Sequence, residues 1–591
     1  MKQKKHKTTE VSGLLPQQAE KREKQVNIFL FFLLLVFGIY QAVIYWGHQA
    51  VPHPDFSCFA IIGRQILSFQ MPTDFKRVPL LGVLQVSLGK ITGGQNPDFT
   101  GAWLLNSIAH SFTAVLLWLV GRKIIGRSAV WFAVVAIINP WGLQLLTEGI
   151  AETTLLFFIW LTFYFIFTRS KWAYLFAALT SMVRYEGSAL ILCAFVLDMI
   201  EGKNKKERIL AFVYAAIASV PLLLWLAGTV FEQGMGTTHY FKVFTKEYKE
   251  QFVGDVAAKT GFVKHAGMLW QVGFYQLFLP SPQAGRDSAQ LLMNLSKMFV
   301  FVSFLFGSVY GLCKRQWKIL VLLIFIIPYF WLHAKYPYPM ARYHATIFAI
   351  VLLICLYGLL SFWKLITDKL KLPKGIIIAL QLVVIIIAII WALGLTGFLP
   401  RLAQMSAASA SLPYVAISAV LIALAAGFLA YKESIIKEIA ILALMVLIIV
   451  SNQFAVASLV GNGGRDIEFK YLADWYVQNA KKGEKLVSTM ANLLASMAPQ
   501  YADDFVPIDD FVDVNTPAEF AEKCFRKNIT YVSWDSRIGY VPSDDYYKMW
   551  RIQNIAPLAA GRDTGPYQFI TQLRANERRF INVYRLRYPA N

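Results

Sequence analysis

The sequence has few charged residues and few cysteines for its length. Charged residues are 16% of the 591 residues and hydrophobic residues are 57%, whereas average proteins are about 25% charged. The five cysteines form no CxxC pair and no Cys/His spacing typical of a metal site. The sequence also has no internal repeat and no low-complexity segment, which argues against a solenoid and against an obvious tandem-repeat transporter. Three of the five cysteines lie in apolar runs, where a small core residue is the simpler interpretation.

Long apolar runs are what the sequence has instead. Residues 1–25 are polar and basic, and the run 26–46 is too long for a signal-peptide core and has no small-residue cleavage site, so it predicts a retained first span. We expect a mainly α fold, a polytopic membrane helix bundle of about thirteen spans. The expected spans are 26–46, 102–121, 128–146, 151–168, 172–183, 187–201, 209–231, 298–313, 318–334, 345–363, 375–398, 412–431 and 438–459, of which the fifth and sixth are short.

The formal net charge of +21 is compatible with nucleic acid binding, but the positions of the basic residues favour a membrane topology. With about thirteen spans, every strongly basic connection falls on one side, which the positive-inside rule makes cytoplasmic. We therefore expect a cytoplasmic N-terminus, a C-terminus outside and no nucleic acid partner. The basic connections are the N-terminus, 122–127, 169–171, 203–208, 314–318, 364–374 and 432–437.

Residues 460–591 change to a mixed polar and apolar composition. Helices are predicted at 464–482 and 516–528, and strands at 485–489, 529–534 and 580–587. The domains are thus expected to be a basic tail 1–25, a transmembrane domain 26–459 with outer loops 47–101 and 232–297, and an extracytoplasmic α/β domain 460–591.

The first outer loop carries charged residues directly after the first span. Asp55 precedes an amphipathic stretch, 56–69, that is typical of a helix lying along the membrane interface. A carboxylate there could be a base, but capping of that helix is the favoured interpretation of this residue alone. Lys76 and Arg77 suit a phosphate, although two basic side chains could equally extend to lipid headgroups.

Further ionisable groups lie at the predicted outer ends of spans. Glu148 and Glu152 are four residues apart and would share a face on a helix. Arg184 and Glu186 lie between two apolar segments, where they could either serve function or brace a broken helix as a salt bridge. Arg342, Tyr343 and His344 end the segment 333–344 and lie at the start of the span that follows it.

Together these motifs resemble the GT-C superfamily of integral membrane glycosyltransferases, near the protein O-mannosyltransferases (glycosyltransferase family 39) and the aminoarabinose transferases of lipid A. The resemblance covers nearly the whole chain, including the C-terminal outer domain. The motifs, in order, are HPDFSCFA, FKRVPLLG, TEGIAETTLLF, MVRYEGSALIL and PMARYHATIFAIVLL.

The resemblance implies a polyprenyl-phosphate-linked sugar donor, hexosyl or pentosyl, and an acceptor hydroxyl on a protein, a lipid or a glycan. It implies that Asp55 acts as base or orients the acceptor, and that basic residues hold the lipid phosphate. The matching basic positions are Lys76, Arg77, Arg184 and Arg342. Glu148, Glu152, Glu186, Tyr343 and His344 are further candidates for the substrate pocket.

One feature sets a limit on this resemblance. Phe56 follows Asp55 where many relatives have a second acid, so no metal site and no cofactor are expected.

The implied location is the lipid bilayer of a bacterial plasma (inner) membrane. A transporter or flippase of a lipid or glycan is the alternative function, and a non-catalytic membrane scaffold is a third.

Overall fold

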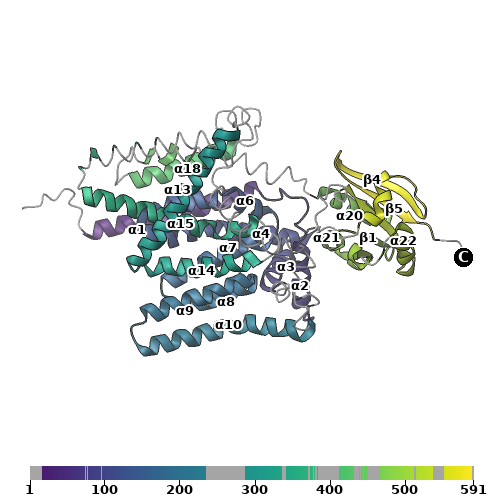
Figure 1. Ribbon diagram of the computed structural model, residues 1–591, viewed down its shortest axis with the longest axis horizontal. Coiled ribbons are helices and arrows are strands. Elements are labelled where there is room, and N and C mark those ends of the chain that lie inside the picture. Colours follow the sequence, from purple (N-terminus) through teal and green to yellow (C-terminus); the bar gives the residue numbers. More distant parts are fainter. Residues whose placement is uncertain are drawn as a thin grey trace, which may run out of the picture.

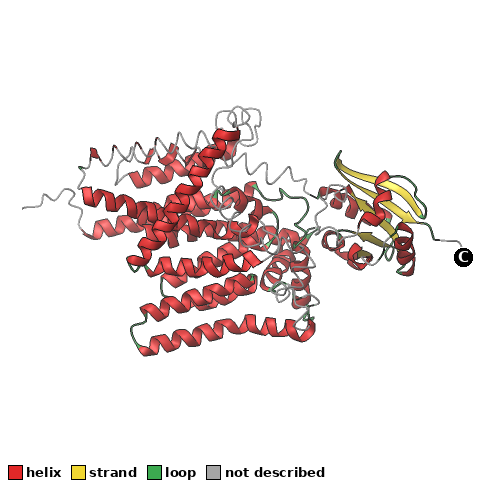
Figure 2. Ribbon diagram, viewed as in Figure 1, coloured by secondary structure: helices red, strands yellow, loops and turns green. Residues whose placement is uncertain are grey.

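The computed structural model describes most of the chain as two regions, a helical one and a smaller one with a sheet (Figures 1 and 2). The described residues are 16–72, 75, 77–94, 96–233, 286–335, 341–370, 412–430, 466–511, 514, 516–536 and 552–588, with isolated residues in 373–386 and 438–449.

The helical region is built of packed helices around one apolar core. That core includes Phe37 of α1, Trp160 of α7, Phe325 of α14 and Ile350 of α15. The helices are α1 (Pro16–Ile44), α2 (Phe56–Leu67), α3 (Leu80–Thr92), α4 (Pro97–Ile125), α5 (Ala129–Ile137), α6 (Pro140–Thr147), α7 (Ala151–Phe167), α8 (Trp172–Val183), α9 (Ala189–Glu201), α10 (Lys205–Gln233), α13 (Arg286–Cys313), α14 (Trp317–Lys335), α15 (Ala341–Leu370) and α18 (Leu412–Ala430).

The protein is an integral membrane protein by the length and apolar character of these helices. Among the described residues, four stretches are long and apolar enough to cross a membrane, or five if one bent pair counts as a span. The four are Glu23–Ile44, Pro97–Ile137, Lys205–Phe231 and Ala345–Lys369. The number of about thirteen spans stays a prediction.

The expected span 128–146 is not one continuous helix, because the chain breaks it into α5 and α6. Pro140 cannot continue a helix, and the Asn139 side chain instead caps α6 by accepting hydrogen bonds from the N–H groups of Trp141 and Gly142. A second break follows at Gly149, which has a positive φ of 69°, and α6 and α7 meet there at 116°. Glu148 and Glu152 therefore do not share a helix face, contrary to the sequence prediction.

The loop between α1 and α4 is itself helical and closely packed. The predicted interface helix is α2, and it packs on α3, which packs on α4. Gly63 of α2 and Gly82 of α3 allow the backbones to touch, since a Cβ atom on Gly63 would lie 2.2 Å from the Gly82 carbonyl oxygen. These three helices form one tight block.

The C-terminal region has a five-stranded sheet with helices packed on it. The order is β2-β1-β3-β5-β4, in which β1 pairs in parallel with β2 and β3, while β5 pairs antiparallel with β3 and β4. The elements are α20 (Ile467–Asn479), β1 (Lys485–Ser488), α21 (Ala491–Met497), β2 (Phe505–Pro507), α22 (Pro517–Arg526), β3 (Ile529–Asp535), β4 (Tyr567–Asn576) and β5 (Arg579–Leu586).

The sequence predictions for this region are confirmed where a strong pattern marks the element. The helices α20 and α22 and the strands β1, β3 and β5 occur where they were expected. The strands β2 and β4 and the helix α21 were not predicted. Of these, α21 packs against α2, so the sheet region lies at the end of the helical region where α2 and α3 are (Figure 1).

Candidate active site

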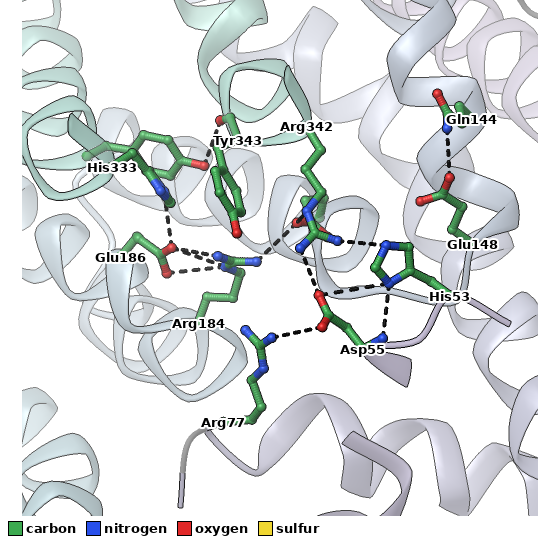
Figure 3. A network of polar contacts seen from close by, with 12 residues as sticks. His53, Asp55, Arg77, Gln144, Glu148, Arg184, Glu186, His333, Arg342 and Tyr343 are labelled. Carbon is green, nitrogen blue, oxygen red and sulfur yellow. Dashed lines mark hydrogen bonds and ion pairs between the residues drawn. The ribbon is translucent and has the colours of Figure 1, made fainter. Parts of the chain in front are cut away.

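Two segments of the first loop and the start of α15 bring charged side chains together (Figure 3). Arg342 Nη2 lies 2.7 Å from Asp55 Oδ2, and Arg77 Nη2 lies 3.2 Å from Asp55 Oδ1. We call these three residues the Asp55 group. Each oxygen of the carboxylate thus faces its own guanidinium group.

Asp55 occupies the N-cap position of α2, but its side chain makes no capping hydrogen bond. The favoured sequence interpretation, an N-cap carboxylate, is therefore wrong about the side chain. The backbone N–H of Asp55 instead donates to Nδ1 of His53. This leaves the carboxylate directed at the two arginines, with 28% of the side chain exposed.

Arg77 is held between the first turn of α2 and the break between α8 and α9. Phe75 is buried, and the Tyr185 hydroxyl donates to its carbonyl oxygen at 3.2 Å. The Arg77 guanidinium lies over the ring of Phe59, 5.4 Å from its centroid, which is a favourable cation–π position. Local contacts thus hold the segment that carries Arg77.

Glu152 connects the Asp55 group to a second set of charges. Its Oε1 atom lies 3.6 Å from Arg342 Nε and 3.1 Å from Arg184 Nη1. Glu152 is in the first turn of α7 and is 97% buried. A carboxylate at a helix N-terminus is also stabilised by the helix dipole.

The second set lies where α8 ends. The backbone of Arg184 is extended there, with φ −153°, and Tyr185–Ser188 form a single 3₁₀ turn. Arg184 Nη2 lies 2.8 Å from Glu186 Oε1, and His333 Nε2 lies 3.1 Å from the same oxygen. We call Glu152, Arg184, Glu186 and His333 the Glu186 group. Its salt bridge braces the broken helix, one of the two roles that the sequence left open.

Tyr343 lies between the two groups. Its ring stacks on His333 with centroids 4.4 Å apart, and the guanidinium groups of Arg184 and Arg342 lie 5.4 and 5.3 Å from its centroid. The Tyr329 hydroxyl donates to the Tyr343 carbonyl oxygen at 2.8 Å. The aromatic ring therefore packs the two groups against each other.

Neighbouring charges shift the pKa values of both groups. Burial alone raises the pKa of Asp55, but Arg77, Arg342 and His53 lower it, and the balance holds it well below its ordinary value. Burial also opposes the charge on Glu186, yet Arg184 and His333 hold the pKa of Glu186 well below its ordinary value. Burial lowers the pKa of Arg342, whereas Glu152 and Asp55 raise it, with a net increase. All three groups are charged at neutral pH.

Some predicted site residues lie elsewhere or beyond what the structure describes. Glu148 lies on the other side of His53 from Arg184 (Figure 3), where its carboxylate accepts a hydrogen bond from Gln144 at 2.7 Å. Lys76 and the His344 side chain lie outside the described residues. Among the residues that are described, no three His, Cys, Asp or Glu side chains gather as they would around a metal ion.

His333 was not among the predicted site residues. It is 95% buried and contacts both Glu186 and Tyr343. Its position at the start of the segment HAKYPYPMARYH, which also holds Arg342, was the available signal. A histidine near the end of an apolar run gives no indication of which distant carboxylate it contacts.

Comparison with known proteins identifies the fold. No protein-family model matches the sequence, and no curated protein matches it. The structure is similar to ArnT from Cupriavidus metallidurans bound to undecaprenyl phosphate, with a TM-score of 0.52 at 13% identity, covering 94% of this chain and 97% of that one. The same protein in the apo state also gives 0.52 at 13% identity, covering 93% and 97%. The chain therefore has the fold of ArnT over almost its whole length, as the resemblance implied.

Proposed function

We propose that the protein is a membrane glycosyltransferase that moves a sugar from a polyprenyl-phosphate-linked donor to an acceptor hydroxyl. The observation that carries this proposal is the Asp55 group, one carboxylate between two arginines. The fold shared with ArnT, which has been seen bound to undecaprenyl phosphate, supports the donor class. In this proposal Asp55 is the base, and Arg77 and Arg342 bind the donor phosphate.

The charges of the Asp55 group fit such a donor. Two guanidinium groups and one carboxylate give a net charge of +1, and a sugar linked through a phosphodiester carries −1. Arginine is suited to this role because its planar fork can donate two parallel hydrogen bonds to a phosphate. A bound phosphate would draw the arginines from Asp55, and the pKa of the carboxylate would then rise from its low value in the free protein.

The same charges fit the reaction step. The acceptor oxygen forms a bond to the anomeric carbon, the bond from that carbon to the phosphate oxygen breaks, and Asp55 takes the hydroxyl proton. The leaving lipid phosphate changes from −1 to −2. Because Asp55 becomes neutral as it takes the proton, the Asp55 group changes from +1 to +2. The net positive charge of the Asp55 group therefore increases as negative charge develops on the leaving phosphate, which stabilises the transition state.

Two helices support an outer location for the site. The helix α7 has Glu152 in its first turn and Arg169 just beyond its last residue, and α15 has Arg342 near its start and Lys369 in its last turn. The site and the basic connections therefore lie at opposite ends of these helices. By the positive-inside rule, this arrangement favours a site on the outer face of the membrane.

The test replaces Asp55 by Asn in the full chain and measures transfer from a polyprenyl-phosphate sugar. Loss of the base should lower transfer by about 10²–10⁴-fold, with thermal stability kept and binding of polyprenyl phosphate retained or tightened. Asp98→Asn is the control, since Asp98 is another carboxylate paired with an arginine, Arg64 at 2.5 Å, and lies outside the Asp55 group. Equal transfer by the Asp55→Asn and wild-type proteins would rule out the base role.

The alternative, a transporter or flippase of a lipid or glycan, makes a different prediction. It requires flux of the lipid or glycan into liposomes and no transferred-sugar product. Both measurements use the same purified protein, so a product formed without flux favours the transferase and flux without a product favours the transporter.

A further inference from the structure

Val51, in the loop after α1, is buried in the core of the sheet region. It is 4% exposed and belongs to the apolar core formed by α20, α21 and the sheet, together with Leu472, Leu486 and Leu493. No other residue of the helical region belongs to that core among the described part of the chain. One side chain of the helical region thus anchors the loop in the sheet region.

A second anchor lies just beyond Asp55, in the helical region. Phe56 is fully buried and packs on Phe99 of α4 with ring centroids 5.4 Å apart. Gly149, at the bend between α6 and α7, allows this contact, because a Cβ atom there would lie 3.0 Å from the Phe99 ring. Asp55 therefore lies between an anchor in one region and an anchor in the other.

The segment between the anchors has little freedom. It contains Pro52 and Pro54, whose rings fix φ near −65°, and the His53 N–H donates to the Glu148 carbonyl oxygen at 3.2 Å. Four residues of extended chain span at most about 14 Å. The segment that connects Val51 to Asp55 is therefore short and stiff.

We propose that the sheet region helps to position the catalytic carboxylate, and that Val51 is the positioning residue through which it acts. This inference rests on the proposed function of Asp55. Arg77 and Arg342 are held by contacts within the helical region, so a change at Val51 alters the place of the carboxylate relative to a bound phosphate. Because a misplacement of about 1 Å can cost about 10²-fold in rate, the effect falls on the chemical step.

The experiment compares three variants of the full chain. Val51→Ala removes the anchor, and Val51→Ile keeps an apolar branched side chain. Val532→Ala is the control, since Val532 is fully buried in the other apolar core of the sheet region, which contains no residue of the loop. Each variant is assayed for sugar transfer, for binding of polyprenyl phosphate and for amide hydrogen exchange in peptides covering residues 48–60.

We expect Val51→Ala to lower kcat by about 10–100-fold, to leave polyprenyl phosphate affinity within about twofold, and to speed exchange at 48–60. Val51→Ile should restore most of the kcat. Val532→Ala should speed exchange in β3 and leave kcat within about threefold.

Two results would overturn the inference: equal kcat losses in Val51→Ala and Val532→Ala, or unchanged exchange at 48–60 in Val51→Ala. The exchange measurement needs no enzymatic activity. If Asp55→Asn keeps full transfer but Val51→Ala speeds exchange at 48–60, the proposed base role fails while the anchoring of the loop stands.

Discussion

The Asp55 group and the Glu186 group are adjacent, are both built from arginine and carboxylate, and yet differ in charge balance and exposure. The Glu186 group has two carboxylates for one arginine, and the Glu186 side chain is 2% exposed. The Asp55 group has two arginines for one carboxylate, and the Asp55 side chain is 28% exposed. The Glu186 group is buried and has an excess of negative charge, whereas the Asp55 group is partly exposed and has an excess of positive charge.

This difference separates bracing from ligand binding among the predicted phosphate-binding residues. Arg184 contacts two carboxylates within 3.1 Å, so an incoming phosphate would meet it already neutralised. Arg77 and Arg342 both contact the partly exposed carboxylate of Asp55, and Arg342 lies farther, at 3.6 Å, from Glu152, so an incoming anion would meet them less fully neutralised. Of the basic residues that the resemblance implied, the two of the Asp55 group are the better candidates, and Lys76 stays a prediction.

Of the changes that test the difference between the two groups, replacing Arg342 by Ala should have the largest effect on kcat. It removes the cation that contacts both groups, and loss of one fixed donor at a developing charge lowers kcat by about 10²–10³-fold. Steady-state kinetics with a polyprenyl-phosphate sugar would measure this effect. Arg342→Lys is the control, which should recover only part of the rate because an ammonium group cannot bind a phosphate with two parallel bonds. Full activity of the alanine variant would contradict the assignment.

Replacing Glu186 by Gln should affect stability instead of chemistry. Removing one partner of a buried ion pair costs about 3–5 kcal/mol, which a thermal unfolding assay in detergent would detect. Transfer per folded molecule should change by less than about fivefold. The control is Glu522→Gln, because Glu522 is 63% exposed and pairs with Arg526 on the surface, where such pairs contribute at most about 1 kcal/mol. A loss of kcat without a loss of stability would place Glu186 in the chemistry.

A smaller effect should appear in the dependence of the rate on pH. In the free protein the pKa of Asp55 is well below its ordinary value, so the carboxylate stays ionised and kcat/KM should show no acid limb between about pH 5 and 8. A bound phosphate competes for the arginines and raises that pKa, so the acid limb of kcat should lie at higher pH than that of kcat/KM. Acid limbs of kcat and kcat/KM at the same pH would show that a bound phosphate does not compete with the Asp55 carboxylate for Arg77 and Arg342.

The sequence predicted the composition of the site better than its geometry. Asp55 and Arg77 were singled out as charges in the loop after the first span, Arg342 as a charge at the start of a span, and Arg184 and Glu186 because ionisable residues between apolar segments are costly. Their pairing could not be predicted, since Asp55 and Arg342 are 287 residues apart and no local pattern reports such a contact. For the same reason His333 was missed, and the interpretation of Asp55 as a capping side chain was wrong.

Secondary structure was predicted well wherever one face or one period dominates. The strand β3 has a continuous buried run and α22 has a capping Thr516 followed by Pro517, and both were found. The short β2 follows a 3₁₀ turn and was missed. The break at Asn139 and Pro140 was overlooked because hydropathy averaged over a window is insensitive to one proline.

The backbone contact between Gly63 and Gly82 has a practical consequence for anyone who labels this protein. Epitope tags and fluorescent domains are commonly inserted into extramembranous loops, and residues 56–92 would be a natural choice from hydropathy alone. Because α2 and α3 touch at Gly63 and Gly82 without side chains between them, a short insertion within either helix would shift the glycines out of register and force the two helices apart. Asp55 and Arg77, which lie just before α2 and α3 and contact each other, would then lose their registration.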